Sequence, residues 1–300
     1  MRVLLLAGVV AVGSILAYLI VGYLVAARLS APVRQPVERT PADVGLDYRE
    51  AVVRSTDGLS LNAWWVEKPG SSRVAVLVHG WAGDMSDLHI VDTALVYHQA
   101  GFNVLMLNLR AHDSSEGERV TLGYREVRDV RGALSWLEER GYDPESVVLH
   151  GWSMGGAAVV RTAPGTGVAA VVEEAAYADL LPVLREQVPR ASGLPAIFNP
   201  GIFLMGERFL GIDPWAVRPE VEARRLSREG VPFMIIHSPD DEVIPFEHAE
   251  SFAAAYPGAT FWKVEGYEHV AAHTHPEYRK RLLNFLDEAV SLAPEKRQGG

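Results

Sequence analysis

One stretch of this sequence has the residue types and spacing of a nucleophilic serine. Gly151-Trp152-Ser153-Met154-Gly155 follows the apolar run Ser146–Leu149 and precedes a segment of small residues. A Gly-x-Ser-x-Gly motif between a strand and a helix places its serine on a sharp turn, where Gly151 and Gly155 leave room for the backbone. The first N–H groups of the helix then point to where negative charge develops during attack on a carbonyl group. The motif predicts Ser153 as a nucleophile in acyl transfer.

A serine hydroxyl needs a base at neutral pH, and the chain has ten histidines. His269 lies after the last predicted strand and before the last predicted helix, and we predict it as this base. His273 and His275 complete a spacing that resembles a metal site, but no carboxylate-rich motif accompanies it, so we expect neither a metal nor another cofactor. Three histidines end other predicted strands and are expected to anchor loops or pack in the core: His79, His150 and His237.

The imidazole needs an acid that orients it, and the loop after the run Phe233–Ile236 offers two. Asp240 and Asp241 are adjacent there, and local pattern does not separate them; a role in capping the turn is the alternative for either. Glu173 and Glu174, which follow Val168–Val172, are weaker candidates.

An oxyanion hole requires two backbone N–H groups near the serine. His79-Gly80-Trp81 follows the first buried run, so the N–H groups of Trp81 and Met154 are the predicted pair. The Trp81 side chain is then free to line an acyl pocket, and packing over the edge of the sheet is an equally good interpretation.

These residues need a parallel sheet that brings strand ends together. From Asp47 to Ala293 the chain alternates apolar β-branched runs with helical periods, which predicts a mostly parallel eight-stranded sheet covered by helices on both faces. The predicted strands are Tyr48–Ser55, Leu59–Val66, Val74–Val78, Asn103–Leu107, Ser146–Leu149, Val168–Val172, Phe233–Ile236 and Thr260–Val264. The predicted helices that flank them include Asp87–Ala100, Tyr124–Arg140 and Pro276–Leu292.

The amino-terminal segment has a different composition. Val3–Ala27 contains no charged residue, and at ~1.5 Å per residue a helix of this length spans roughly 37 Å, enough for a bilayer core. We therefore predict a transmembrane anchor over residues 1–28, with a signal peptide trimmed near Ala26 as the alternative. Flanking arginines nearly balance, and we expect a single-pass cell-membrane protein with an exported catalytic domain. Residues 29–46 contain Pro32, Pro36 and Pro41 and predict an extended linker.

Composition excludes several classes of function. The 28 Lys+Arg against 38 Asp+Glu give a formal charge of −10, so nucleic acid is not an expected partner. The chain has no cysteine, which excludes disulfides, cysteine–zinc sites and thiol nucleophiles. The oligomeric state is not determined by these patterns.

With strand, Gly-Trp-Ser-Met-Gly, Asp and His in this chain order, residues 47–293 resemble the α/β-hydrolase superfamily, and within it the serine-aminopeptidase and monoacylglycerol-lipase-like hydrolases. The resemblance implies Asp241 as the acid of a Ser153–His269–Asp241 triad. The loop Asn108–Ser114 departs from that group's pattern because it lacks two glycines and an aspartate, which puts the shape of this loop in doubt.

Such folds carry a lid between the sixth and seventh strands, and residues 175–229 fit this position, with 294–300 left as a tail. Together with the predicted anchor, the ordered motifs predict a membrane-anchored serine esterase that cleaves an apolar small-molecule acyl ester through an acyl-enzyme. The same machinery also serves peptidases and thioesterases, and an idle, anchored interaction module is a further alternative.

Overall fold

The computed structural model describes residues 2–291 of the chain, and a single mixed sheet organises the part that follows the amino-terminal helix. Its strand order is β1-β2-β4-β3-β5-β6-β7-β8. The strands are β1 Arg49–Arg54, β2 Ser60–Val66, β3 Val74–Val78, β4 Asn103–Leu107, β5 Val147–Trp152, β6 Ala170–Glu174, β7 Phe233–His237 and β8 Thr260–Lys263. Only the pairs β1–β2 and β2–β4 are antiparallel, so the carboxyl ends of β3 to β8 lie at one edge.

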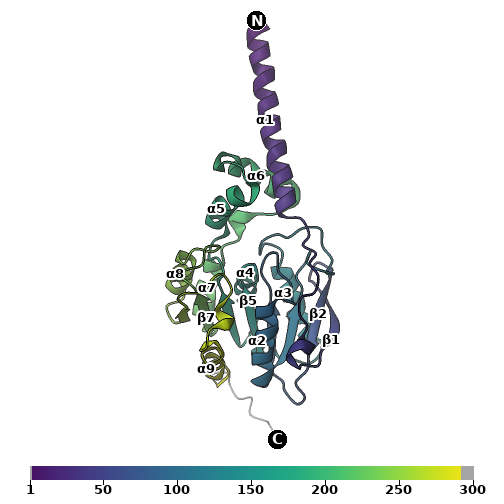
Figure 1. Cartoon of the computed structure of the whole chain (residues 1–300), viewed down its shortest axis with the longest axis vertical. Coiled ribbons are helices and arrows are strands. Elements are labelled where there is room, and N and C mark those ends of the chain that lie inside the picture. Colours follow the sequence, from purple (N-terminus) through teal and green to yellow (C-terminus); the bar gives the residue numbers. More distant parts are fainter. Residues whose placement is uncertain (1, 292–300) are drawn as a thin grey trace.

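The central strands are buried and mostly apolar because helices cover both faces of the sheet. Every residue of β3, β4, β5, β6 and β7 is buried. On one face lie α2 (Leu88–Gln99) and α9 (Tyr278–Ser291). On the other lie α3 (Val127–Glu138), α4 (Met154–Thr162) and α8 (Glu247–Ala255). Figure 1 shows these layers, and the predicted α/β architecture is confirmed.

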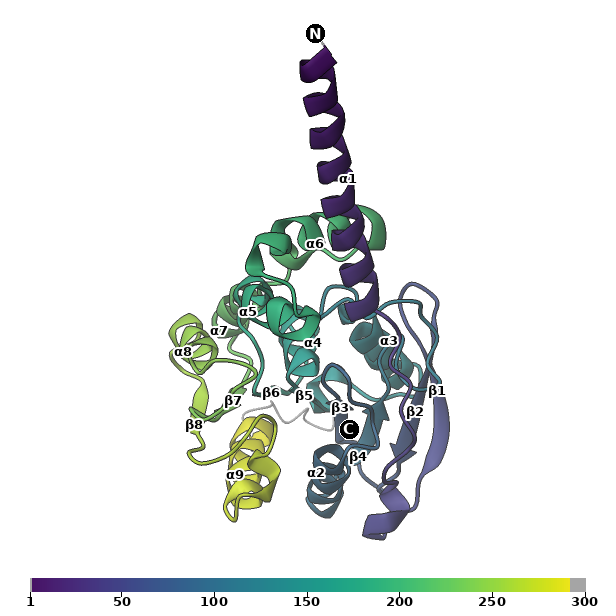
Figure 2. The ribbon, with the colours of Figure 1, turned by 45° about the horizontal axis from the view of Figure 1, so that its top comes forward.

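The segment between β6 and β7 is helical. It contains α5 (Leu180–Ser192), α6 (Asn199–Met205) and α7 (Pro219–Glu229), with a π-helical turn over Gly206–Leu210. Helix α7 packs against α4 and α8 of the body. Helices α5 and α6 lie above the carboxyl edge of the sheet, between the body and the amino-terminal helix, as Figure 2 shows.

That amino-terminal helix, α1, runs from Arg2 to Leu29 and projects from the body. It is long and apolar enough to cross a membrane, with a mean hydropathy of 2.6 over its most apolar window. The proline-rich segment that follows runs over the surface of the body: the Val33 N–H donates to the Ala111 carbonyl oxygen at 2.8 Å, and Arg39 pairs with Asp92 at 2.8 Å. The predicted tail 294–300 lies outside the described residues.

Candidate active site

Ser153 lies on a strained turn between β5 and α4. Its φ of 52° and ψ of −118° are unusual for a residue with a side chain, and its N–H donates to the Glu174 carbonyl oxygen at 2.8 Å. A backbone of this kind costs about 1–3 kcal/mol and persists because the surrounding structure enforces it. The turn presents the hydroxyl at the carboxyl edge of the sheet, beside the first N–H groups of α4.

The glycines of the motif are required by close backbone approach. A Cβ on Gly151 would lie 2.4 Å from the carbonyl carbon of Gly155. A Cβ on Gly155 would lie 2.1 Å from the carbonyl oxygen of Val78 and 2.3 Å from that of His79. These contact partners are backbone atoms of α4, of β3 and of the residue after β3, so no flexible side chain can move aside to make room.

Gly155→Ala is therefore expected to destabilise the protein by about 3 kcal/mol, the upper range for inserting a methyl group into a well-packed site. The cost arises because α4 or the loop after β3 must move to make room for the methyl group. Urea unfolding measures the free-energy change. Gly13→Ala in α1 is the matched control, since a Cβ there meets nothing within 4 Å; equal stability of the two variants would contradict the prediction.

A histidine–carboxylate pair lies at the same edge. His269 Nδ1 is 2.7 Å from Asp241 Oδ2, and the other oxygen of Asp241 accepts from the N–H groups of Val243 at 2.8 Å and Ile244 at 2.9 Å. With Nδ1 donating its proton, His269 Nε2 is left free to accept one. Burial opposes the charged carboxylate, but hydrogen bonds from His269, Ile244 and Val243 outweigh it and lower the pKa of Asp241 from 3.8.

Asp240 points elsewhere. Its side chain is exposed, and Oδ2 accepts from the Gly266 N–H at 2.7 Å, a turn-capping contact. The structure thus brings Asp241, and not Asp240, to His269. Val270, the residue after His269, has a φ of 52°, a strained value for a β-branched residue that sequence patterns did not indicate.

The Ser153 hydroxyl and the His269 ring, both in the described part of the chain, form no hydrogen bond in this structure. Such contacts are often open before substrate binds and tighten in the enzyme–substrate complex. The two residues nevertheless follow strands of one sheet, and the His269 loop is tied to β5 and β6: Glu174 accepts from the Trp152 indole at 3.0 Å and from the Ala272 N–H at 3.1 Å.

Glu173 and Glu174 do not orient His269. Glu174 forms the bridge just described, and Glu173 Oε2 accepts from the Ala176 N–H at 2.9 Å while its other oxygen has no partner. Burial raises the pKa of Glu174 to about 7 and that of Glu173 well above 4.5. Glu173 is therefore a neutral, structural carboxyl group beneath the site.

Glu173→Gln is expected to gain stability over the wild type as the pH rises. The folded state keeps a proton that the unfolded state releases above its ordinary pKa of 4.5, so the wild type loses stability as the pH rises from there through the folded-state pKa. Glutamine has no such proton and still offers an oxygen to Ala176. Urea unfolding at about pH 5 and about pH 8 measures the difference. Glu138→Gln, exposed on α3, is the control; a pH-independent difference for Glu173→Gln would contradict the prediction.

The loop after β3 lies against Ser153. A Cβ on Gly80 would lie 3.1 Å from the Cβ of Ser153. His79 is buried and fixes this loop, because its Nε2 accepts from the Leu109 N–H at 3.0 Å. Trp81 follows, with its side chain 46% exposed. The geometry brings Trp81 and Ser153 to one cavity, together with Met154.

That cavity is apolar and has a volume of about 160 Å³. Residues of the body and of α5 line it, together with Leu29 of α1. Its lining comprises Leu29, Trp81, Leu122, Ser153, Met154, Tyr177, Leu180, Val183, Leu184, Gln187, Val188, Ala191, Val243 and Ile244. Such a surface suits an apolar acyl group next to Ser153.

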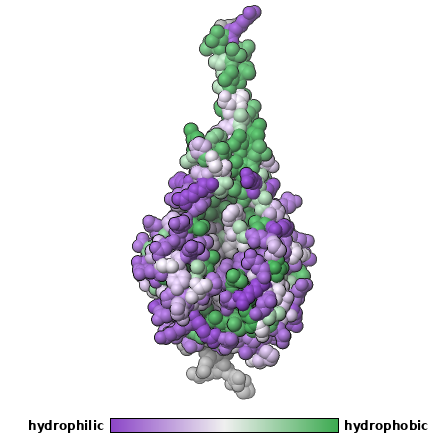
Figure 3. Space-filling view, viewed as in Figure 1, coloured by the Kyte–Doolittle hydropathy of each residue, from purple (hydrophilic) through white to green (hydrophobic). Residues whose placement is uncertain are grey.

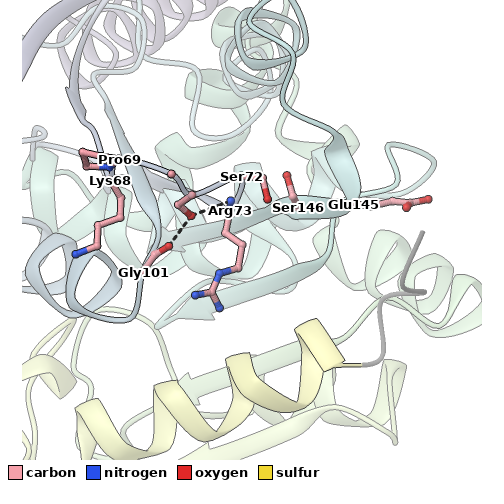
Figure 4. Close-up of a pocket in the computed structure, with 9 residues that line it drawn as sticks. Lys68, Pro69, Ser72, Arg73, Gly101, Glu145 and Ser146 are labelled. Atoms are coloured by element: carbon pink, nitrogen blue, oxygen red, sulfur yellow. Dashed lines mark hydrogen bonds between the residues drawn. The ribbon is translucent and has the colours of Figure 1, made fainter. Parts of the chain in front are cut away.

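A larger depression of about 590 Å³ lies at the opposite edge of the sheet. Lys68, Arg73, Gly101 and Glu145 line it, close to the amino ends of β3 and β5, as Figure 4 shows. Ligands of parallel α/β sheets bind outside the carboxyl ends of the strands, so this depression is not the site of the serine chemistry.

The Asn108–Ser114 loop keeps a left-handed backbone where the family pattern has glycine. Ala111 has a φ of 60° and Asp113 a φ of 40°. Arg110 holds the loop from within, pairing with Asp129 at 2.6 Å and Asp57 at 2.8 Å, and Asn108 accepts from the Met85 N–H at 2.8 Å. Side-chain contacts thus enforce the turns that glycine makes easily.

The other histidines have structural surroundings. The ring of His150 stacks on Trp152 at 4.0 Å, and His237 Nε2 lies 2.9 Å from the Ile244 carbonyl oxygen. His273 lies beside His89, with 6.0 Å between the ring centroids. Within residues 2–291, no group of three or more His, Asp or Glu side chains is placed to hold a metal ion.

Comparisons with known proteins identify relatives of this chain. The model of the "Alpha/beta hydrolase family" matches residues 75–278. Uncharacterized protein YfhR of Escherichia coli O157:H7 is 26% identical over 248 residues, which cover 78% of this chain and 79% of that protein. The alpha/beta hydrolase domain-containing protein WAV2 of Arabidopsis thaliana is 25% identical over 270 residues, covering 86% and 84%.

Solved structures share the fold. The Pyrococcus furiosus esterase Pf2001 superposes with a TM-score of 0.70 at 20% identity, over 86% of this chain and 97% of that one. Est1E from Butyrivibrio proteoclasticus, with ferulic acid bound, superposes with a TM-score of 0.63 at 17% identity, over 80% and 99%.

Proposed function

Because this chain belongs to the alpha/beta hydrolase family, we propose that it is a serine hydrolase that cleaves carboxylic esters through an acyl-enzyme. The observation that carries the proposal is the 2.7 Å contact between His269 and the buried Asp241, at the sheet edge that also presents Ser153 on a strained turn. Esterases among the structural relatives are consistent with this reaction class.

In the proposed first step, His269 Nε2 takes the proton of the Ser153 hydroxyl while its oxygen attacks the ester carbonyl carbon. The N–H groups of Trp81 and Met154 stabilise the oxyanion of the tetrahedral intermediate. His269 then gives its proton to the departing alcohol, which leaves an acyl group on Ser153. Water, activated by the same imidazole, releases the acid and restores the hydroxyl.

Asp241 serves this cycle without changing its own charge. Its lowered pKa keeps it ionised at neutral pH, so it stabilises the imidazolium that forms in each half-reaction and fixes the ring tautomer. The apolar cavity beside Ser153 favours an apolar acyl group over a charged one.

The proposal includes a membrane anchor. Helix α1 has the length and hydropathy of a span, and its last turns pack on the lid. Cleavage near Ala26 would uncover the apolar side chains of Val188, Ile202 and Phe203, which supports retention of the helix. The exported orientation of the domain stays part of the proposal.

A substrate panel tests the leaving group. Purified protein is assayed on 4-nitrophenyl esters of increasing acyl length, on the matching thioesters and on aminoacyl anilides. We expect apolar acyl esters to give the highest kcat/KM. Faster turnover of the anilides or thioesters would replace the esterase assignment with a peptidase or thioesterase.

A further inference from the structure

Helix α1 does not simply project from the domain, because its last turns are built into the lid. A Cβ on Gly22 would lie 2.7 Å from the carbonyl carbon of Gly201 in α6, so the two helices cross at backbone contact. The Tyr18 hydroxyl accepts from the Gly201 N–H at 3.0 Å and donates to the Ile197 carbonyl oxygen at 2.8 Å. Figure 2 shows α6 alongside this part of α1.

The length of α1 outside this contact is short for a membrane span. Residues from Arg2 to Ala17 are exposed, and contact with the lid begins at Tyr18. At ~1.5 Å per residue, Val3–Ala17 spans about 22 Å, whereas the bilayer core of about 30 Å needs ~20 residues. A span that begins near Val3 therefore continues past Tyr18, which brings α6 to the bilayer surface.

Three large apolar side chains of the lid are exposed near α1, and the exposed Glu207 and Arg208 lie in the same turn as one of them. Ile197, Leu204 and Phe209 are 74%, 48% and 63% exposed. Phe209 packs edge-on against Tyr23 of α1, with 6.3 Å between ring centroids, so this surface is continuous with the helix. Figure 3 shows the hydrophobic stem above a largely hydrophilic body. Tyrosines at this level are typical of a membrane–water interface.

A second apolar cavity adjoins the one that contains Ser153. This cavity of about 60 Å³ lies between α1 and the lid, lined by residues that include Ala26 and Phe203. It shares Leu29, Leu184 and Val188 with the cavity that contains Ser153.

We propose that Ile197, Leu204 and Phe209, together with α1, form a membrane-contact surface that lies in the interfacial region of the bilayer. The acyl substrate then enters the Ser153 cavity from the lipid phase, and the preferred substrates are lipid esters resident in the membrane. The second statement rests on the proposed function, whereas the first does not.

The depth of the lid in a bilayer tests the first statement directly. The chain has no cysteine, so one introduced cysteine carries a nitroxide spin label at a single position. The full chain with Leu204→Cys or Phe209→Cys is labelled and reconstituted in phosphatidylcholine vesicles. The relaxation of the spin label caused by oxygen, which concentrates in lipid, is compared with the relaxation caused by a water-soluble nickel chelate. Leu16→Cys in α1 is the lipid reference, and Ser72→Cys, exposed at the opposite edge of the sheet, is the aqueous reference.

We expect both lid labels to relax more strongly with oxygen than with the nickel chelate, as at Leu16. If the nickel chelate relaxed the lid labels as strongly as the label at Ser72, the proposed membrane contact would be wrong. The measurement needs no turnover, so it distinguishes this result from a failure of the proposed esterase activity.

Substitutions that introduce a charge on the contact surface test whether the substrate enters from the lipid phase. Leu204→Glu and Phe209→Glu lie outside the lining of the Ser153 cavity. We expect them to lower hydrolysis of a long-chain ester in vesicles by about tenfold or more, because a carboxylate disfavours insertion into lipid, and to leave a water-soluble short-chain ester within about twofold. Val221→Glu, on α7, is the matched control. Equal losses on the two substrates, or no loss on either, would overturn entry from the lipid phase.

Discussion

Replacing Ser153 with alanine is expected to reduce ester turnover by about 10⁶-fold, which corresponds to about 8 kcal/mol of transition-state stabilisation. The effect is this large because the hydroxyl is the atom that forms the covalent bond, and the base and acid cannot act without it. Substrate binding in the apolar cavity should change little, since the variant removes a single oxygen. Single-turnover and steady-state rates with the best ester of the panel measure the loss.

A fluorophosphonate probe gives a second readout of the same variant. The wild type should become labelled through the Ser153 oxygen, and Ser153→Ala should not. Ser135→Ala is the matched control, because Ser135 is exposed on α3, and it should keep full labelling and turnover. Undiminished turnover in Ser153→Ala would reject the serine mechanism. A wild type that neither reacts with the probe nor turns over any ester would favour an idle interaction module.

The elements that position the site follow largely from local patterns. Val74–Val78 and Asn103–Leu107 form β3 and β4 with the predicted bounds, since strands buried on both faces consist mainly of apolar residues. The strand before Ser153 extends to Trp152, beyond the predicted end at Leu149, because pairing with β6 continues to Trp152. Glu173 and Glu174 similarly belong to β6, although two adjacent carboxylates are typical of a loop.

Contacts between elements that are far apart in the chain could not be predicted from sequence patterns. Asp240 and Asp241 are adjacent, and only the position of His269 in three dimensions separates them. The crossing of Gly22 and Gly201 joins segments far apart in the chain, and neither glycine carries a local signal of its partner. The resemblance to the α/β-hydrolase superfamily is confirmed. The narrower likeness to serine aminopeptidases and monoacylglycerol lipases stays a prediction.

The second large effect is expected on kcat when Asp241 is replaced, and the adjacent Asp240 provides the matched control. Asp241→Asn is expected to lower kcat by about 10⁴-fold with an intact fold, because an amide in that position favours the wrong imidazole tautomer and no longer stabilises the imidazolium. Asp240→Asn should cost less than about tenfold, since its side chain only accepts a hydrogen bond from the Gly266 N–H. Steady-state rates of the two variants, measured side by side with circular dichroism spectra, make the comparison.

The dependence of the unfolding free energy on pH in the acidic range gives an independent check on the role of Asp241. A carboxylate with a lowered folded-state pKa contributes stability that is present above its ordinary pKa of 3.8 and is lost as the pH falls through the folded-state value. Asp241→Asn removes this contribution, so its unfolding free energy should depend less on pH below about 4 than that of the wild type or of Asp240→Asn. The opposite result would be a larger loss of rate, and a weaker pH dependence of the unfolding free energy, in Asp240→Asn. In that case Asp240 would orient the imidazole, and the contact between Asp241 and His269 would be structural only.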